Sequence, residues 1–130
     1  MGPPGEVRFA RASDGVDIAY LTAGEGPRDL VLIFGFTTHL DVCWEIPWFS
    51  EWVRRSSEHF RTIVFDKRGT GLSDRPVGSG SIEQRTQDVL AIMDAVGSER
   101  ASFVGISEGG PMAIVCASMY PERVERMVFY

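Results

Sequence analysis

Four short apolar runs, separated by segments with helical periodicity, constrain the fold of this chain more than any other feature. They cover residues 30–34, 62–65, 101–104 and 127–130 and are rich in β-branched and aromatic side chains. Strands that are buried on both faces of a parallel sheet read as continuous apolar runs of this kind. Because strands and helices alternate, the sequence predicts an α/β fold with a mostly parallel sheet and flanking helices.

The segment before the first run has a different pattern. Residues 7–11 and 16–21 each alternate apolar with polar or charged side chains, and Ser13, Asp14 and Gly15 lie between them. Alternation with a period of two is typical of half-buried strands, and a short polar link favours a hairpin. We therefore expect an antiparallel hairpin ahead of the parallel strands.

One helix is expected between the first two runs, over residues 41–55. Trp44, Trp48 and Trp52 recur there at intervals of four, which places them on one helical face. Pro47 fits only in a first turn or before it, so the start of this helix stays open between Asp41 and Pro47.

Two further helices have clearer ends. Ser81 and Gln84 form a capping box that predicts a helix start, and Gly97 supplies a left-handed stop. Residues 111–120 are apolar nearly all round, so we expect a buried helix there that ends before Pro121.

Composition narrows the class of protein. The chain has 130 residues, which fits one domain over 1–130, and its formal net charge of −5 argues against a nucleic acid partner. No apolar run is long enough to span a membrane. Cys43 and Cys116 are expected to be buried, reduced packing residues, and no metal or cofactor motif is present. These features predict a cytoplasmic protein.

A serine with catalytic potential follows the third run. Residues 105–109 read Gly-Ile-Ser-Glu-Gly, a G-x-S-x-G motif between a predicted strand and a predicted helix. In that context the motif predicts a nucleophile elbow that presents the Ser107 hydroxyl at the carboxyl edge of the sheet. The backbone amide of Glu108 is then one candidate oxyanion donor, and the amide of Phe36 is the second. The plainer alternatives are a serine that caps a helix and a glycine that only ends a strand.

Three segments together resemble the α/β-hydrolase superfamily. They read FGF at 34–36, FDKRGTGLSD at 65–74 and GISEGGPMA at 105–113. More narrowly, the last two resemble hydrolase domains associated with class III adenylate and guanylate cyclases. The resemblance implies that Ser107 is the nucleophile and that the amides of Phe36 and Glu108 form the oxyanion hole.

The sequence departs from the superfamily pattern in two ways. Phe34 stands where many members have a histidine that braces the oxyanion loop. The superfamily places the acid and the histidine of its triad after the serine, but neither Asp nor His follows Ser107. We therefore expect a truncated fold without the lid and last strands, and half of a catalytic site. His39, in the loop after the first run, could replace the base only if it reached the serine.

Three functions stay open on this basis. The first is a serine hydrolase that acts on carboxylic esters or related small acyl substrates. The second is a non-catalytic binding or regulatory module, which could serve a cyclase. The third is half of an assembly, in which the terminal apolar strand pairs with another copy or with a complementing C-terminal half.

Overall fold

The computed structural model describes residues 2–35, 37–78 and 80–130. Its core is a six-stranded sheet in the order β1-β2-β4-β3-β5-β6. The strands are β1 (Arg8–Arg11), β2 (Asp17–Ala23), β3 (Asp29–Ile33), β4 (Arg61–Phe65), β5 (Ala101–Gly105) and β6 (Val124–Phe129). The helices are α1 (Pro47–Ser57), α2 (Ile82–Ala95) and α3 (Gly109–Met119), with 3-10 turns at Cys43–Glu45 and Pro121–Arg123.

The sheet confirms the predicted mixture of strand directions. β1 and β2 form the antiparallel hairpin, in which Ala10 lies opposite Ile18, and β2 is also antiparallel to β4. β3 is parallel to both β4 and β5, and β5 is parallel to β6. The chain passes from β3 to β4 on one side and then to β5 on the other. The carboxyl ends of β3 and β5 therefore meet where the strand order reverses, which is where ligands bind in such sheets.

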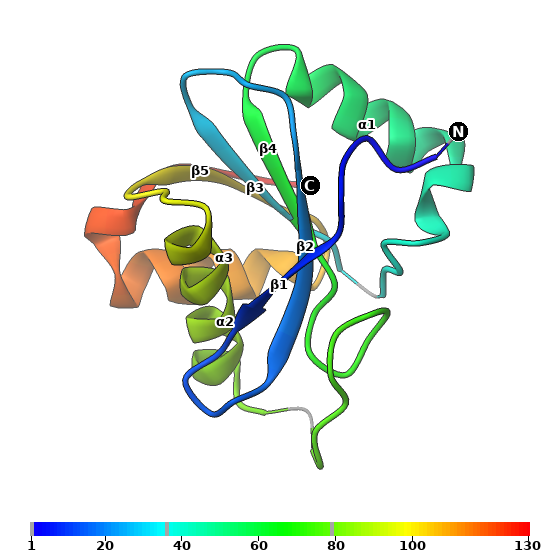
Figure 1. The fold of residues 1–130 in the computed structure, drawn as a ribbon. Coiled ribbons are helices and arrows are strands. Elements are labelled where there is room, and N and C mark those ends of the chain that lie inside the picture. Colours follow the sequence, from blue (N-terminus) through cyan, green and yellow to red (C-terminus); the bar gives the residue numbers. More distant parts are fainter. Residues whose placement is uncertain (1, 36, 79) are drawn as a thin grey trace.

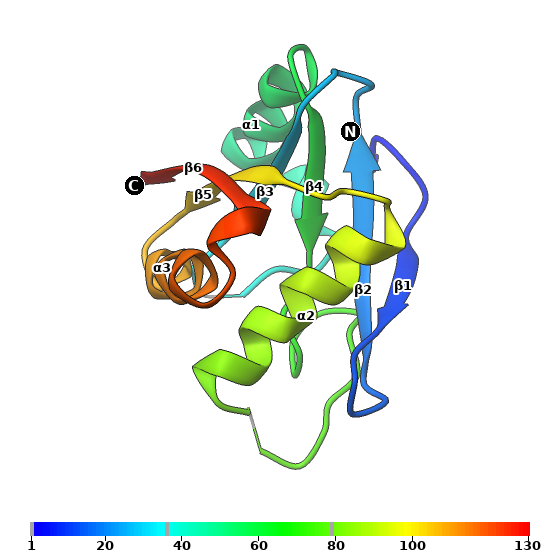
Figure 2. The ribbon, with the colours of Figure 1, turned by 90° about the vertical axis from the view of Figure 1, so that its left-hand side faces the viewer.

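Helices cover both faces of the sheet, as Figures 1 and 2 show from two directions. α1 lies on one face, over a core that includes Leu32, Phe49 and Val64. α2 and α3 lie on the other face, over a core that includes Ile63 and Phe103. β3 and β4 thus bury side chains on both sides, which explains their continuous apolar sequences. The run at 127–130 differs from this expectation, because β6 lies at the edge of the sheet and its residues after Val124 are exposed.

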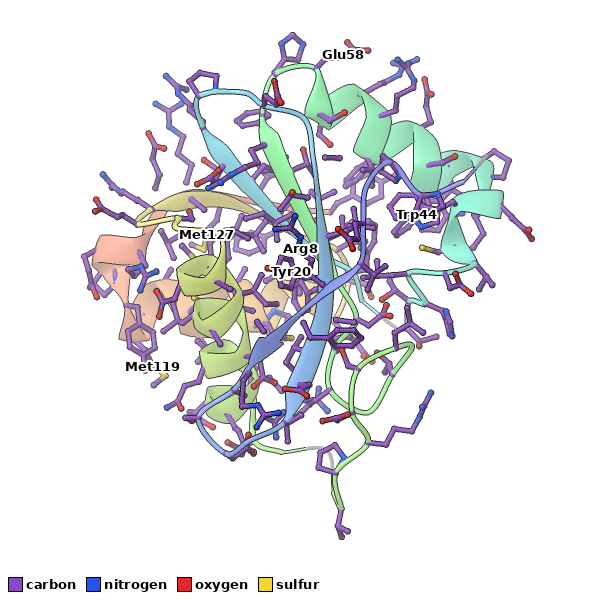
Figure 3. The ribbon with its side chains drawn as sticks, in the orientation of Figure 1. Arg8, Tyr20, Trp44, Glu58, Met119 and Met127 are labelled. Atoms are coloured by element: carbon purple, nitrogen blue, oxygen red, sulfur yellow. The ribbon has the colours of Figure 1, made fainter. Side chains whose placement is uncertain are left out.

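The first helix begins later than residues 41–55 suggested. The chain forms a 3-10 turn at Cys43–Glu45, and α1 starts at Pro47, its first helical residue. Proline suits this position because the first amide of a helix has no intrahelical acceptor. Trp44 therefore lies before α1 (Figure 3), where it is buried and its indole N–H donates to the Leu40 carbonyl at 2.6 Å.

α2 has the predicted start and stop. The Ser81 hydroxyl accepts the amide of Gln84 at 3.1 Å, and Gly97 follows the helix with a φ of 72°. The Gln84 side chain, however, donates to Asp14 in the β1–β2 turn at 2.6 Å. This contact ties the start of α2 to the hairpin.

The expectation that the third helix is buried all round is wrong. Met112, Ala113 and Cys116 of α3 are buried, but Ile114 is 50% exposed and Met119, labelled in Figure 3, is 41% exposed. α3 packs on α2 and on the sheet with one side only, so its apolar outer side faces solvent in this chain. An all-apolar sequence cannot reveal which side is covered.

Both cysteines are free and buried, as predicted. Burial raises the pKa of the Cys43 and Cys116 thiols to about 11, so both are protonated and unreactive at neutral pH. Within residues 2–35, 37–78 and 80–130, none of the helices combines the length and apolarity that crossing a bilayer requires.

Candidate active site

Ser107 lies in a sharp turn between β5 and α3. β5 ends at Gly105 and α3 begins at Gly109, so three residues connect the strand to the helix. Ser107 has a φ of 53° and is the only non-glycine residue with positive φ in the described part of the chain. This left-handed conformation costs about 1–2 kcal/mol for a residue with a side chain, so the surrounding structure has to hold it. The turn leaves Ser107 exposed.

Main-chain hydrogen bonds hold the turn from both sides. The Ile106 amide donates to the Ile33 carbonyl at 2.9 Å, which continues the pairing of β5 with β3. The Ser107 amide donates to the Tyr130 carbonyl at 2.8 Å, next to the end of β6. The Gly110 amide donates back to the Ser107 carbonyl at 3.0 Å. The strained residue is therefore fixed by two neighbouring strands and by the first turn of α3.

Close packing explains the glycines on either side of Ser107. A Cβ on Gly105 would lie 2.7 Å from the Gly110 Cα, and one on Gly109 would collide with the Ile33 carbonyl oxygen. Both contacts are with backbone atoms, which cannot move aside as a flexible side chain can. The G-x-S-x-G spacing thus lets α3 start directly against β3 and β5.

The loop after β3 reaches the same turn through Gly35. A Cβ on Gly35 would lie 2.7 Å from the Ile106 carbonyl oxygen and 2.8 Å from the Ser107 Cβ. The predicted oxyanion donor next in the chain, Phe36, lies outside the described residues. The amide of the other predicted donor, Glu108, is 3.1 Å from that same Cβ position, so it borders the space beside Gly35.

The Glu108 amide has no hydrogen-bond acceptor among the residues that the structure describes. It precedes the first turn of α3, where amides lack intrahelical acceptors and the helix dipole favours negative charge. An amide in this position can donate to an oxyanion.

The loop after β4 anchors the neighbourhood of the turn through buried charges. The buried Asp66 carboxylate accepts the Thr38 hydroxyl at 2.5 Å and the amides of Leu40 and Leu72 at 3.1 and 2.8 Å. It therefore joins the loop after β3 to the loop after β4. The sequence showed Asp66 only as part of a family motif. Its partners could not be predicted, because nothing in the motif shows which amides the carboxylate accepts.

Arg68 anchors the same loop to the other face of the sheet. Its guanidinium is 2% exposed and binds both oxygens of Asp88 in α2, at 2.6 and 2.7 Å. It also donates to Asp14 in the hairpin turn at 2.9 Å. Hydrogen bonds to Asp88 and then to Asp14 raise the pKa of Arg68, and the bond from Arg68 lowers the pKa of Asp14. The network fixes α2 and the hairpin relative to the loop.

Phe34, which stands in place of a histidine, belongs to an aromatic cluster. Its ring centroid lies 4.6 Å from that of Phe49 and 6.2 Å from that of Trp48. Trp44 packs edge-on against Phe49 at 5.1 Å. Aromatic contacts at these distances stabilise their surroundings beyond simple burial, so packing holds the end of β3.

His39 lies at a separate opening. Its ring Nδ1 accepts the Asp41 amide at 3.3 Å, and it lines a cavity of about 430 Å³ together with Thr38, Val42 and Arg75. The structure thus places His39 in the loop after β3, at a cavity shared with the loop after β4, with its ring bonded locally.

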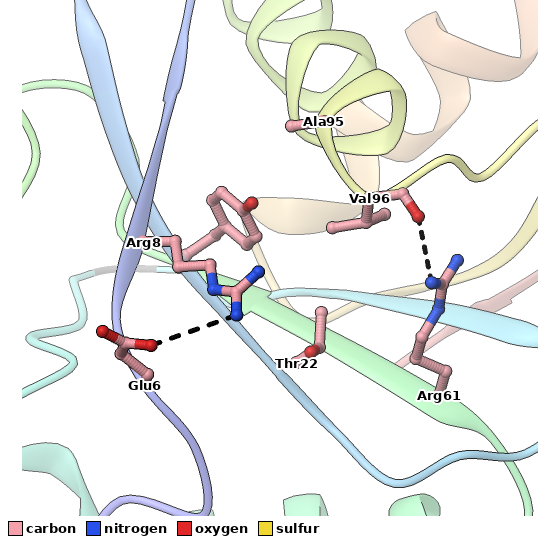
Figure 4. A pocket seen from close by; sticks show the side chains of 7 residues that line it. Glu6, Arg8, Thr22, Arg61, Ala95 and Val96 are labelled. Atoms are coloured by element: carbon pink, nitrogen blue, oxygen red, sulfur yellow. Dashed lines mark hydrogen bonds and ion pairs between the residues drawn. The ribbon is translucent and has the colours of Figure 1, made fainter.

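A second cavity, of about 270 Å³, lies away from the turn (Figure 4). It is bordered by Arg8, Thr22 and Arg61, and Arg61 is the first residue of β4. Arg61 donates to the Val96 carbonyl at 2.9 Å, as Figure 4 shows. This cavity therefore opens at the amino end of β4, whereas Ser107 lies at the carboxyl ends of the parallel strands.

The strand order and the turn after β5 define a class of α/β proteins whose ligand site lies at the carboxyl ends of a mostly parallel sheet. The profile of the alpha/beta hydrolase fold family matches residues 30–130. The chain therefore belongs to this family.

Relatives and solved structures agree with this assignment. The chain is 29% identical over 113 residues to 3-oxoadipate enol-lactonase 2 of Acinetobacter baylyi, a match that covers 87% of the chain and 40% of the relative. It is 39% identical over 75 residues to 2-hydroxymuconate semialdehyde hydrolase of Pseudomonas putida, which covers 57% of the chain and 27% of the relative. A crystal structure of a hydrolase from Pseudomonas aeruginosa superposes with a TM-score of 0.84 and 31% identity, over 96% of this chain and 45% of that one. The chain thus spans less than half the length of these proteins.

Proposed function

We propose that this chain supplies the nucleophile and part of the oxyanion hole of a serine hydrolase that acts on carboxylic esters or related small acyl compounds. The observation that carries the proposal is the left-handed Ser107, held exposed between β5 and α3 with a φ of 53°. A serine is rarely kept in such a conformation without a functional reason. The names of two relatives, an enol-lactonase and a carbamate hydrolase, specify acyl substrates and support this class.

In this proposal the Ser107 oxygen attacks the acyl carbon, and the carbonyl oxygen becomes an oxyanion. The Glu108 amide and the predicted Phe36 amide would donate hydrogen bonds to it, and one such donor contributes about 3 kcal/mol to a transition state. A base has to take the serine proton. Because no Asp or His follows Ser107 in this sequence, the proposed site on this chain consists of the nucleophile and the oxyanion donors.

Covalent labelling tests the proposal on the chain as it is. A fluorophosphonate releases fluoride when a serine oxygen displaces it at phosphorus, and intact-mass spectrometry counts the adducts. We expect Ser107 to react faster than the other exposed serines by about 10³-fold, the residual advantage of an oxyanion hole without its base. Ser107→Ala removes the adduct, while Ser57→Ala, at the last residue of α1, leaves it unchanged. Equal labelling of all serines would contradict a serine hydrolase site.

The terminal strand supports a second, separate proposal about partners. β6 is one of the two edge strands of the described sheet, and its side chains Met127, Val128 and Phe129 are 37%, 58% and 52% exposed. An apolar edge strand favours pairing with another strand. We propose that β6 pairs with a complementing polypeptide or with a second copy. Sedimentation velocity across micromolar concentrations tests the second copy, which a concentration-independent monomer would exclude.

Two finer predictions stay proposals. The family profile and the relatives concern hydrolases, so an association with class III cyclases rests on the motifs at 65–74 and 105–113 alone. A regulatory module of that kind would keep its partner affinity in Ser107→Ala, which a pull-down with purified cyclase domain measures. A cytoplasmic location likewise rests on composition.

A further inference from the structure

Lys67, the second residue after β4, is the only lysine in the sequence. It is also buried, with 8% of its surface exposed. Lysine is rarely buried without a partner, because an ammonium group loses much of its favourable hydration when it leaves water. The contacts of this side chain therefore need an explanation.

The Lys67 ammonium donates a hydrogen bond to the carbonyl oxygen of Gly35. No carboxylate among the described residues lies within ion-pair distance of it. This distinguishes it from the next residue, Arg68, which binds two carboxylates. The contact of Lys67 is thus with the main chain of the loop after β3.

The charges near Lys67 come from both sides of the site. Burial, followed by the positive charge of Arg85 in α2, lowers the pKa of Lys67, while Glu108 at the elbow raises it. The hydrogen bond from Lys67 to Gly35 is therefore present although burial and Arg85 disfavour the ammonium charge. A charge-assisted hydrogen bond is about twice as strong as a neutral one, which makes an ammonium an effective donor for this purpose.

Gly35 is the residue of the loop that touches the elbow, since its Cβ position is 2.8 Å from the Ser107 Cβ. A peptide unit is planar, so a bond to the Gly35 carbonyl restricts the rotation of the whole unit. The sequence predicts that the amide of this unit, which belongs to Phe36, is the second oxyanion donor. On one side of this unit aromatic packing holds Phe34, and on the other Asp66 holds Thr38. Lys67 acts on the peptide unit between them.

We propose that Lys67 is a positioning residue that orients the Gly35 peptide unit for oxyanion binding beside Ser107. The inference rests on the proposed serine hydrolase function for its purpose. The contact and the orientation can be measured without turnover.

Nuclear magnetic resonance can observe this one peptide unit. The sequence contains a single Gly-Phe pair, at 35–36. Carbonyl-¹³C glycine combined with ¹⁵N phenylalanine therefore gives one correlated carbonyl–amide signal for the full chain. Loss of a hydrogen bond to a carbonyl moves its ¹³C signal to lower frequency. We expect that shift in Lys67→Met, and we expect Lys67→Arg, which keeps a charged donor, to return the signal toward its original position.

A second sample, with ¹⁵N valine in place of phenylalanine, controls for a general loss of structure. The sequence contains a single Gly-Val pair, at 15–16 in the hairpin turn, so this sample gives one carbonyl signal from another part of the fold. The Gly15 signal should stay in place in both Lys67 variants. An unchanged Gly35 signal in Lys67→Met would overturn the inference, and so would a shift that Lys67→Arg fails to reverse.

Labelling of Ser107 connects the contact to chemistry. If Lys67 orients an oxyanion donor, Lys67→Met should slow fluorophosphonate labelling on the order of 10²-fold, the loss typical when one such donor is removed. Lys67→Arg should recover most of the rate. A full rate in Lys67→Met would overturn the positioning role. If wild-type Ser107 does not react selectively, the proposed serine hydrolase function fails. The Gly35 carbonyl shift in Lys67→Met and its recovery in Lys67→Arg then decide by themselves whether Lys67 orients the Gly35 peptide unit.

Discussion

The strained conformation of Ser107 predicts that removing its side chain altogether stabilises the fold. Ser107→Gly keeps the turn and removes the Cβ, which is the source of strain at a φ of 53°. Ser107→Ala is the matched control, because alanine lacks the hydroxyl but keeps the Cβ. Both variants lose the proposed nucleophile, so their difference isolates the backbone.

Two opposing contributions set the size of this difference. Relief of the left-handed conformation stabilises the folded state by about 1–2 kcal/mol. Glycine also makes the unfolded chain more flexible, which costs about 0.4–1 kcal/mol. We therefore expect the free energy of unfolding of Ser107→Gly to exceed that of Ser107→Ala by about 0.5–1 kcal/mol.

Urea denaturation followed by tryptophan fluorescence measures this difference. With a slope of about 2 kcal/mol per molar urea, the two midpoints should differ by about 0.3–0.5 M. Equal slopes would show that the unfolded states are comparable. A Ser107→Gly midpoint at or below that of Ser107→Ala would refute the claim that the fold holds this residue under strain.

Three further predictions concern the surroundings of the turn. Gly35→Ala should destabilise the protein by about 1–3 kcal/mol in urea melts, because its Cβ would meet backbone atoms of the elbow; an unchanged midpoint would mean that the loop moves aside freely. Asp88→Ala, which leaves Arg68 without its bidentate partner, should cost about 3–5 kcal/mol, against less than about 1 kcal/mol for Asp17→Ala in an exposed ion pair. Burial lowers the pKa of Lys67, so the unfolded chain binds the Lys67 proton more tightly than the folded chain does. The free energy of unfolding of the wild type relative to Lys67→Met should therefore rise as pH increases toward 10.5. A flat or falling difference over pH 8–10 would contradict this.

Local sequence patterns predicted the elements and their order. Continuous apolar runs indicated the parallel strands, alternation indicated the hairpin, and Ser81 and Gly97 marked the ends of α2. These three sequence patterns succeed as predictors because each of them, burial on two faces, burial on one face and helix capping, depends on only a few neighbouring residues. The start of α1 was less certain, because a tryptophan at helical spacing can pack equally well from a turn that precedes the helix. Trp44 lies in such a 3-10 turn.

The sequence by itself determined the family, the elbow motif and the candidate nucleophile, because strand, glycines and helix are adjacent along the chain. Only the tertiary structure decided what surrounds the serine. Lys67 stands within the motif at 65–74, and nothing local shows that its ammonium meets the Gly35 carbonyl. That contact spans 32 residues and depends on β3 and β4 lying side by side. A pattern along the chain specifies which face a residue takes, whereas its partner across the sheet is set by the packing of the whole fold.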